Sequence, residues 1–208
     1  MMEKLIEIDK QLLLAINGWH SESMDSFMWL CSQKWTWIPL YVLLVGSLVY
    51  LFYVQKRDWK TLLAVLLGFA LTIALSDMIS TQLFKNTICR LRPTHDPTIA
   101  SLVHIVHDYR GGLYGFVSSH AANTMGIALL FGLVWLRGTK EKRTSQNWTF
   151  ATVGLAILLV GYVLLNCYSR MYLGVHFPGD ILGGLLVGAM VATGVYYGLV
   201  YWEKKWNH

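Results

Sequence analysis

The chain has 208 residues, of which 55% are hydrophobic and only 14% carry a charge. Soluble domains usually contain about 25% charged residues, so this composition excludes a disordered chain and argues against an ordinary soluble enzyme. The mean hydropathy of +0.45, with nine Trp and eleven Tyr, is typical of a protein that crosses lipid headgroups. Three Cys are too few for a disulfide framework and lack zinc-ligand spacing. Because the chain is so apolar, its net charge of +5 is interpreted first as a signal of membrane topology.

The N-terminal region differs from the rest of the chain. Residues 1–16 carry apolar side chains at helical spacing between charged ones, which predicts an amphipathic helix at the membrane interface. The apolar positions are Leu5, Ile8, Leu12 and Ile16. Residues 22–35 form a weaker apolar stretch, for which we expect a short partial helix.

Five later segments are long and apolar enough to cross a bilayer, which takes about 20 residues. They cover about residues 37–54, 61–79, 121–136, 149–167 and 181–202. The fifth is rich in Gly, which favours close helix packing in lipid. We therefore expect an all-α integral membrane protein, with residues 1–208 forming a single domain. Its architecture is expected to be a bundle of about five to six transmembrane helices preceded by the interfacial helix.

Basic residues gather after the first, third and fifth spans. They are Lys56, Arg57, Lys60, Arg137, Lys140, Lys142, Arg143, Lys204 and Lys205. The positive-inside rule places these loops in the cytoplasm, so residues 80–119 and 168–178 face outward. Because membrane topology accounts for these basic residues, we expect no nucleic-acid partner. The small size and the lack of glycosylation-rich loops indicate a bacterial inner membrane.

The first outward segment contains KNTICRLRP, residues 85–93. Lys85 and Arg92 are two helical turns apart, so they share a face if this stretch is helical, and Pro93 would end that helix. Two cations on one face suit an anion. Charges that snorkel to the membrane surface explain the pair equally well.

A second motif, FVSSHAAN, lies where the third span begins. Ser118 and Ser119 fit N-cap positions, and His120 falls in the first turn. A helix start offers free backbone N–H groups and the positive end of a dipole, which together can bind an anion. By itself the motif is better explained as a helix cap beside an interfacial His.

The third motif, SRMYLGVHFPGD, contains a possible His–Asp pair. Pro178 fits the first turn of the fifth span. Asp180 then lies near the membrane level, where a carboxylate needs a partner, and His176 is the natural candidate. An Asp that accepts from one imidazole nitrogen makes the other a better nucleophile or base. Arg170 adds a third cation.

Topology brings these three motifs to one face of the membrane, which chance snorkelling does not predict. The set combines a cationic cradle, a helix N-terminus, a His–Asp pair and a second His, and it fits phosphoryl transfer through a phosphohistidine. Cations and N–H groups neutralise the phosphate oxygens, one His attacks, and the other protonates the leaving oxygen.

In this order, K-x6-R-P, S-x-H and S-R-x5-H-x3-D resemble the signature motifs of the type-2 phosphatidic acid phosphatase family, over residues 85–180. The resemblance implies a metal-independent membrane phosphatase without a cofactor, acting on lipid phosphates such as phosphatidic acid, phosphatidylglycerol phosphate, isoprenoid diphosphates and lipid A. It implies that His176 is the nucleophile, that Asp180 orients it, and that His120 is the general acid. The implied phosphate-binding residues are Lys85, Arg92, Ser118, Ser119 and Arg170.

Two features depart from the family pattern. The second motif is usually Pro-Ser-Gly-His, whereas this chain has Val117-Ser118-Ser119-His120; no proposed catalytic group is lost. The family often has six spans, whereas five are counted here. The second difference concerns the N-terminal architecture rather than the site.

The sequence ranks undecaprenyl diphosphate and phosphatidylglycerol phosphate first as substrates. Arg90, Arg110 and His95 share the outward segment and would receive a second phosphate, although contact with lipid headgroups explains both Arg residues equally well. Asp77 in the second span is costly in lipid unless it faces the bundle. Two other functions stay open, a lipid head-group phosphotransferase and a non-enzymatic lipid-phosphate carrier, and the oligomeric state is not determined.

Overall fold

The computed structural model describes residues 2–142 and 146–206. Among them are five helical segments long and apolar enough to cross a membrane. They are Lys34–Gln55, Trp59–Ile88, Ser119–Gly138, Trp148–Tyr172 and Pro178–Lys205. The predicted all-α membrane architecture is confirmed, and the second span continues nine residues beyond its predicted end.

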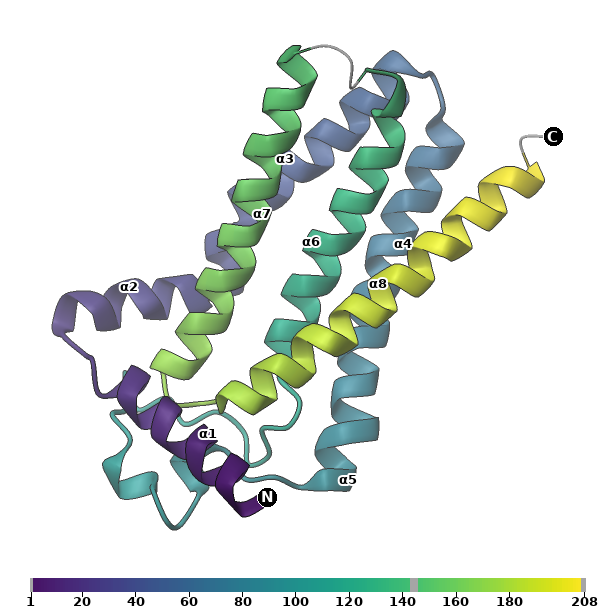
Figure 1. The fold of residues 1–208 in the computed structure, drawn as a ribbon. Helices are drawn as coiled ribbons and strands as arrows, with labels where there is room; N and C mark the ends of the chain where they lie inside the picture. The colour runs from purple at the N-terminus through teal and green to yellow at the C-terminus, as the bar shows by residue number, and fades with distance from the viewer. Residues whose placement is uncertain (1, 143–145, 207–208) are drawn as a thin grey trace.

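Figure 1 shows a bundle of long helices with two shorter N-terminal helices at one end. In chain order the α-helices are α1 (Met2–Asn17), α2 (Glu22–Ser32), α3 (Ile38–Leu48), α4 (Trp59–Met78), α5 (Asn86–Ile88), α6 (Ser119–Gly138), α7 (Gln146–Tyr172) and α8 (Pro178–Trp206). Short 3₁₀ segments are η1 (Lys34–Trp37), η4 (Pro93–His95), η5 (Ala100–Leu102) and η6 (Lys140–Lys142), and π-helical turns η2 (Val49–Gln55) and η3 (Ile79–Lys85) extend α3 and α4.

Both helices predicted in the N-terminal region are present. α1 is amphipathic: Leu13 is fully buried, whereas Leu5, Ile8 and Leu12 are half or more exposed. α2 begins at a Ser21 cap whose hydroxyl accepts from the Met24 N–H. It covers most of residues 22–35, where a short partial helix was expected. The chain therefore reaches its first span through two helices outside the bundle (Figure 1).

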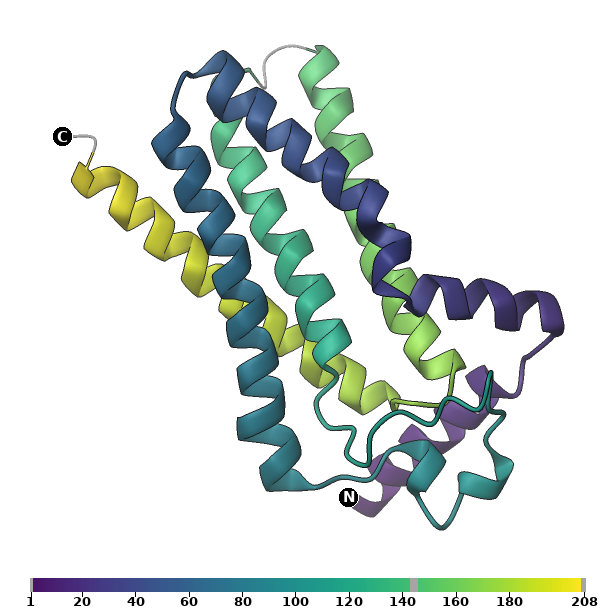
Figure 2. The ribbon, with the colours of Figure 1, turned by 180° about the vertical axis from the view of Figure 1, so that it is seen from behind.

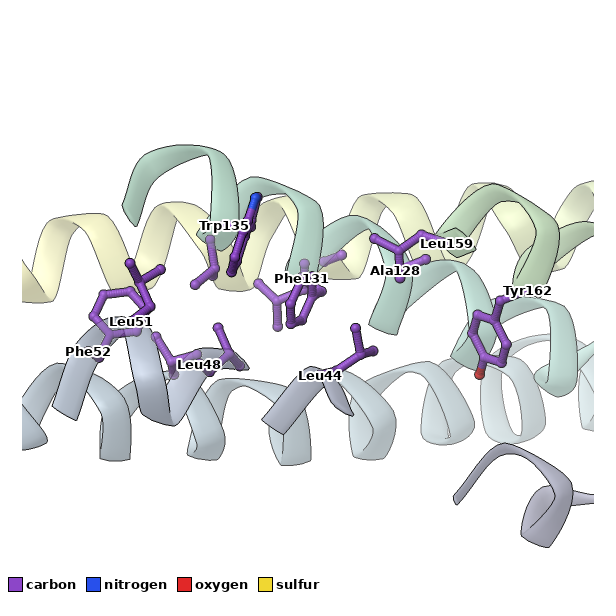
Figure 3. Packing of buried hydrophobic residues seen from close by; sticks show 13 residues of the cluster. Leu44, Leu48, Leu51, Phe52, Ala128, Phe131, Trp135, Leu159 and Tyr162 are labelled. Carbon is purple, nitrogen blue, oxygen red and sulfur yellow. The ribbon is translucent and has the colours of Figure 1, made fainter. Parts of the chain in front are cut away.

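The main core lies between α3 with its η2 extension, α4, α6, α7 and α8. Figure 3 shows Phe131 and Trp135 of α6 facing Leu44, Leu48 and Leu51 of the first span. Lipid tails are as apolar as these side chains, so van der Waals packing rather than exclusion of water holds such helices together.

α6 and α8 approach one another most closely through Gly residues of α8. A Cβ atom at Gly188 would lie 2.2 Å from the carbonyl oxygen of Ala122. Real Cβ atoms do not reach so close to backbone, so this crossing requires Gly. The Gly-rich character of the fifth span thus has the packing role that the sequence suggested.

The two ends of the bundle carry different loops. The connections after η2 and after α6 lie at the same end as the C-terminus, while the N-terminus, α5 and the α7–α8 connection lie at the other (Figures 1 and 2). This arrangement matches the predicted alternation of basic and outward loops. Arg143, one of the predicted cytoplasmic charges, lies outside the described residues.

Gly188→Ala is expected to lower the stability of the protein by about 1–3 kcal/mol, the usual cost of overpacking. Gly194→Ala on the same helix is the control, because nothing lies within 4 Å of a Cβ there and Ala favours a helix over Gly by about 1 kcal/mol. Thermal unfolding in detergent measures both. Equal melting temperatures for the two variants would contradict the close α6–α8 contact.

Candidate active site

The three motifs meet at the end of the bundle that carries α5 and the α7–α8 connection (Figure 1). α6 supplies the second motif at its N-terminus, and α7 and α8 supply the two ends of the third. Lys85 is the last residue of η3, one turn before the end of the second span at Ile88, and Arg92 lies in the loop beyond that span. Lys85, Arg92, Arg170 and His120 all act electrostatically on His176, so the structure brings the predicted cations and both His residues together.

The start of α6 has the predicted cap. Ser118 precedes the helix, and its hydroxyl accepts from the Ala121 N–H at 3.4 Å. The backbone N–H of Ser118 donates to the carbonyl oxygen of Asp180 at 2.9 Å, which joins the second motif to the third. The Ser119 hydroxyl accepts from Lys85 Nζ at 2.8 Å, so this hydroxyl lies beside a motif cation.

The condition for a shared helix face of Lys85 and Arg92 is not met, because the stretch between them is not helical throughout. α5 ends at Ile88, and Cys89 takes a left-handed conformation with φ +52°, four residues before Pro93. Arg92 itself is extended, and its N–H donates to the carbonyl oxygen of Leu113 at 3.0 Å. A tertiary contact between two loop segments, rather than helical periodicity, therefore positions Arg92.

The Arg92 guanidinium is buried and held by backbone. Its Nε donates to the Tyr114 carbonyl at 3.1 Å, and its Nη1 donates to the Val175 carbonyl at 3.1 Å. Burial and the neighbouring Arg170 lower the pKa of Arg92 to about 10. The group thus remains a cation at neutral pH, in a fixed orientation.

His176 is 1% exposed and lies between this cation and Asp180. Its Nε2 lies 3.1 Å from Arg92 Nη1. A guanidinium only donates, so Nε2 is the accepting nitrogen and the proton is on Nδ1, which lies 3.5 Å from Asp180 Oδ2. Burial, and then Arg92, Arg170 and Lys85, hold the pKa of His176 well below its usual value. The imidazole is therefore neutral, with its Nε2 lone pair directed at the cations.

Both carboxylate oxygens of Asp180 have donors. Oδ2 accepts from the Phe177 N–H at 3.0 Å, and Oδ1 accepts from Arg90 Nη1 at 2.9 Å. Arg90 also contacts Asp9, at 2.6 Å. From the sequence, Arg90 was a candidate either for a second phosphate or for contact with lipid headgroups, whereas the structure pairs it with two carboxylates.

Arg170 is held by residues that the sequence analysis missed. Its Nη1 donates to the Ser32 hydroxyl, and its Nη2 donates to Tyr109 Oη at 3.2 Å. Its Nε is buried without a hydrogen-bond partner among the described residues. No motif signals Ser32 or Tyr109, because they belong to α2 and to an outward loop that are distant in sequence.

A cavity of about 490 Å³ opens beside the second motif. Ser119, His120, Asn123 and Lys34 line it near the site, and apolar side chains line the part inside the bundle. Those side chains come from the first and second spans and α6, and include Leu44, Leu48, Phe69, Ile73 and Phe131. The cavity therefore connects a polar site to an apolar space between helices.

Asp77 also lines this cavity, and the Asn123 side chain donates to its Oδ1 at 3.0 Å. Asp77 is exposed, so the carboxylate has a polar partner beside the cavity rather than a place in the packed interior of the bundle. Within residues 2–142 and 146–206, no three His, Cys, Asp or Glu side chains gather closely enough to hold a metal ion.

Comparison with known proteins identifies the family of the chain. Residues 61–204 match the family model described as the PAP2 superfamily. A lipid A 4'-phosphatase of Porphyromonas gingivalis is 34% identical over 99% of this chain and 78% of its own length. A lipid A 4'-phosphatase of Bacteroides thetaiotaomicron is 36% identical over 90% of this chain and 75% of its own length.

Among solved structures, the transmembrane PAP2-type phosphatidylglycerolphosphate phosphatase of Bacillus subtilis has the same fold. The TM-score is 0.65 with 20% identity, covering 98% of this chain and 88% of the other. The chain belongs to the PAP2 superfamily. It is an integral membrane lipid phosphatase, a hydrolase that acts on phosphoric esters.

Proposed function

We propose that the chain hydrolyses a phosphate monoester of the lipid A type through a phosphohistidine on His176. The neutral, buried imidazole of His176, whose Nε2 is directed at Arg92, carries the mechanistic part of this proposal. The two lipid A 4'-phosphatases among the relatives support the substrate.

In the first step, the substrate phosphate takes the place of Nε2 as the partner of Arg92. Nε2 attacks phosphorus, an Nε2–P bond forms, and the ester P–O bond breaks. Arg92, Arg170, Lys85 and the N–H groups at the start of α6 neutralise the phosphate oxygens. The negative charge of the bound phosphate favours the imidazolium form of His120, which gives a proton to the leaving alkoxide. The Asp180 carboxylate stabilises the positive charge that develops on His176.

In the second step, water attacks phosphorus, His120 takes the proton of that water, and the Nε2–P bond breaks. Phosphate leaves, and His120 is protonated again. The same chemistry with another acceptor in place of water would give a phosphotransferase. A carrier would use the cations alone and would not need His176 or Asp180.

The cavity beside the second motif supports a lipid as substrate. Its apolar part, lined by Leu44, Phe69 and Phe131, suits an acyl chain, while Ser119 and His120 at its polar end would hold the head group beside the second motif. A soluble phosphate ester would leave this apolar part unused.

The higher ranking of undecaprenyl diphosphate and phosphatidylglycerol phosphate depended on free cations for a second phosphate. Arg90 is engaged by Asp9 and Asp180. His95 lies 3.0 Å from the Thr94 hydroxyl through its Nδ1. Arg110 is exposed and is the remaining cation of the three. The engagement of Arg90 weakens the case for a second phosphate, and the similarity to lipid A 4'-phosphatases supports a lipid A-type substrate.

A panel of lipid phosphates tests the substrate. Purified protein is assayed for phosphate release from lipid A, undecaprenyl diphosphate, phosphatidylglycerol phosphate and phosphatidic acid, with excess EDTA throughout. We expect the highest kcat/KM for lipid A and removal of its 4'-phosphate. A tenfold or greater preference for a diphosphate lipid would overturn the substrate proposal, and loss of all activity in EDTA would contradict the metal-independent mechanism.

Substitutions at the two His residues test the mechanism. His176→Ala is expected to abolish turnover, because no nucleophile remains. Asp180→Asn is expected to retain a small fraction of the activity. His120→Ala is expected to lower kcat for a lipid phosphate by about 10²-fold or more, the usual contribution of general acid catalysis. A nitrophenyl phosphate should lose much less, because nitrophenolate leaves without a proton. Equal losses on both substrates would rule out the acid role of His120.

We also propose that the site faces the extracytoplasmic side of a bacterial inner membrane, because the basic loops lie at the opposite end of the bundle. Cys89 is exposed next to the site, whereas Cys31 and Cys167 are buried. A membrane-impermeant maleimide added to intact spheroplasts should therefore label the protein, and Cys89→Ser should abolish labelling. Labelling of Cys89 only after lysis would place the site in the cytoplasm.

A further inference from the structure

A chain of charged contacts runs from the N-terminal helix to the His–Asp pair. Asp9 on α1 contacts Arg90 Nη2 at 2.6 Å, and Arg90 Nη1 contacts Asp180 Oδ1 at 2.9 Å. The Arg90 guanidinium lies 4.1 Å above the Phe177 ring, which restricts its movement. Asp9 lies outside residues 61–204, which match the family model.

Asp9 also caps the start of α8 by accepting a hydrogen bond from its first turn. The first backbone N–H groups of a helix lack partners within the helix, and Asp9 Oδ1 accepts from the Gly179 N–H at 2.7 Å. A Cβ at residue 179 would lie 2.9 Å from Asp9 Oδ2, so Gly179 permits this close approach. One carboxylate on α1 thus holds both the first turn of α8 and the Arg that contacts Asp180.

Arg90 fixes the direction of the Asp180 carboxylate. The Phe177 N–H alone would fix one carboxylate oxygen, and the carboxylate could still rotate about it. The hydrogen bond from Arg90 to the other oxygen prevents this rotation. With both donors in place, Oδ2 stays 3.5 Å from His176 Nδ1. Without Arg90, the fully buried Asp180 would also lose its ion-pair partner.

Asp9 in turn limits how far Arg90 neutralises Asp180. A guanidinium shared by two carboxylates gives each less than one full positive charge. Asp180 then keeps more negative potential toward the Nδ1 proton of His176, which supports the imidazole when it becomes positive in the attack.

We propose that Asp9 and Arg90 are positioning residues that act on the reaction through Asp180. The inference rests on the proposed roles of His176 and Asp180. Its consequence is that the N-terminal helix forms part of the catalytic apparatus, although it carries none of the three motifs.

The alternative is that Asp9 and Arg90 merely tether α1. The helix has other tethers, which provide a matched control: Lys10 pairs with Asp96 at 2.9 Å and with the Thr98 hydroxyl at 2.6 Å. Lys10 neighbours Asp9 on the same helix, and neither of these two partners belongs to the His–Asp pair. Lys10→Gln therefore removes a tether and leaves Asp180 untouched.

Steady-state kinetics on the full-length protein with nitrophenyl phosphate test the proposal. Arg90→Gln and Asp9→Asn are expected to lower kcat, the former by about 10- to 100-fold, as loss of a partner behind a His ligand does in metal sites. KM should change less than threefold, because neither residue contacts phosphate. Arg90→Lys and Asp9→Glu should recover part of kcat, and Lys10→Gln should keep wild-type values.

A double-mutant cycle separates positioning from tethering. Arg90→Gln combined with Asp180→Asn should be no slower than Asp180→Asn alone, since Arg90 acts only through that carboxylate. Multiplicative losses in the double variant would overturn the proposal, as would equal kcat losses in Asp9→Asn and Lys10→Gln. If His176→Ala retained turnover, the phosphohistidine mechanism itself would fail, which is a different outcome.

Discussion

The site depends on the burial of a neutral imidazole between a cation and a carboxylate. His176 and Asp180 are almost completely buried, and an unpaired charge at that depth would be costly. Arg90 offsets this cost by pairing with Asp180, and Arg92 donates to the neutral imidazole, but each is oriented only because other groups hold it. The backbone carbonyls of Tyr114 and Val175 fix Arg92, whereas Asp9 fixes Arg90. The placement of loops and of α1 thus follows from the need to keep one His–Asp pair buried and oriented.

The membrane fold supplies the rest of the site by joining helix ends. The cap of α6 meets the first turn of α8 through the Ser118 N–H and the Asp180 carbonyl, and the close α6–α8 crossing at Gly188 holds these two ends together. The cavity that begins at His120 continues between apolar helices. This continuity suits a lipid substrate, whose acyl chain would stay among the helices while its head group lies beside Ser119 and His120.

Several features of this protein followed from its sequence alone. Runs of about 20 apolar residues fix the spans because unpaired backbone polar groups are not tolerated in lipid. Local rules also predicted the Ser118 cap and the position of Pro178 in the first turn of α8, since both depend on neighbouring residues. The order of the three motifs in the sequence is sufficient to indicate the family.

Only the tertiary structure decided how the charges are paired. Helical spacing would give Lys85 and Arg92 a common face only in a continuous helix, but the helix ends at Ile88 and a loop contact places Arg92. Spacing also left Arg90 as a candidate for a second phosphate, because no local rule links it to Asp9, 81 residues away. Ser32 and Tyr109 were missed for the same reason. Periodicity and capping describe interactions within one turn or two, whereas each cation here is oriented by partners from distant segments.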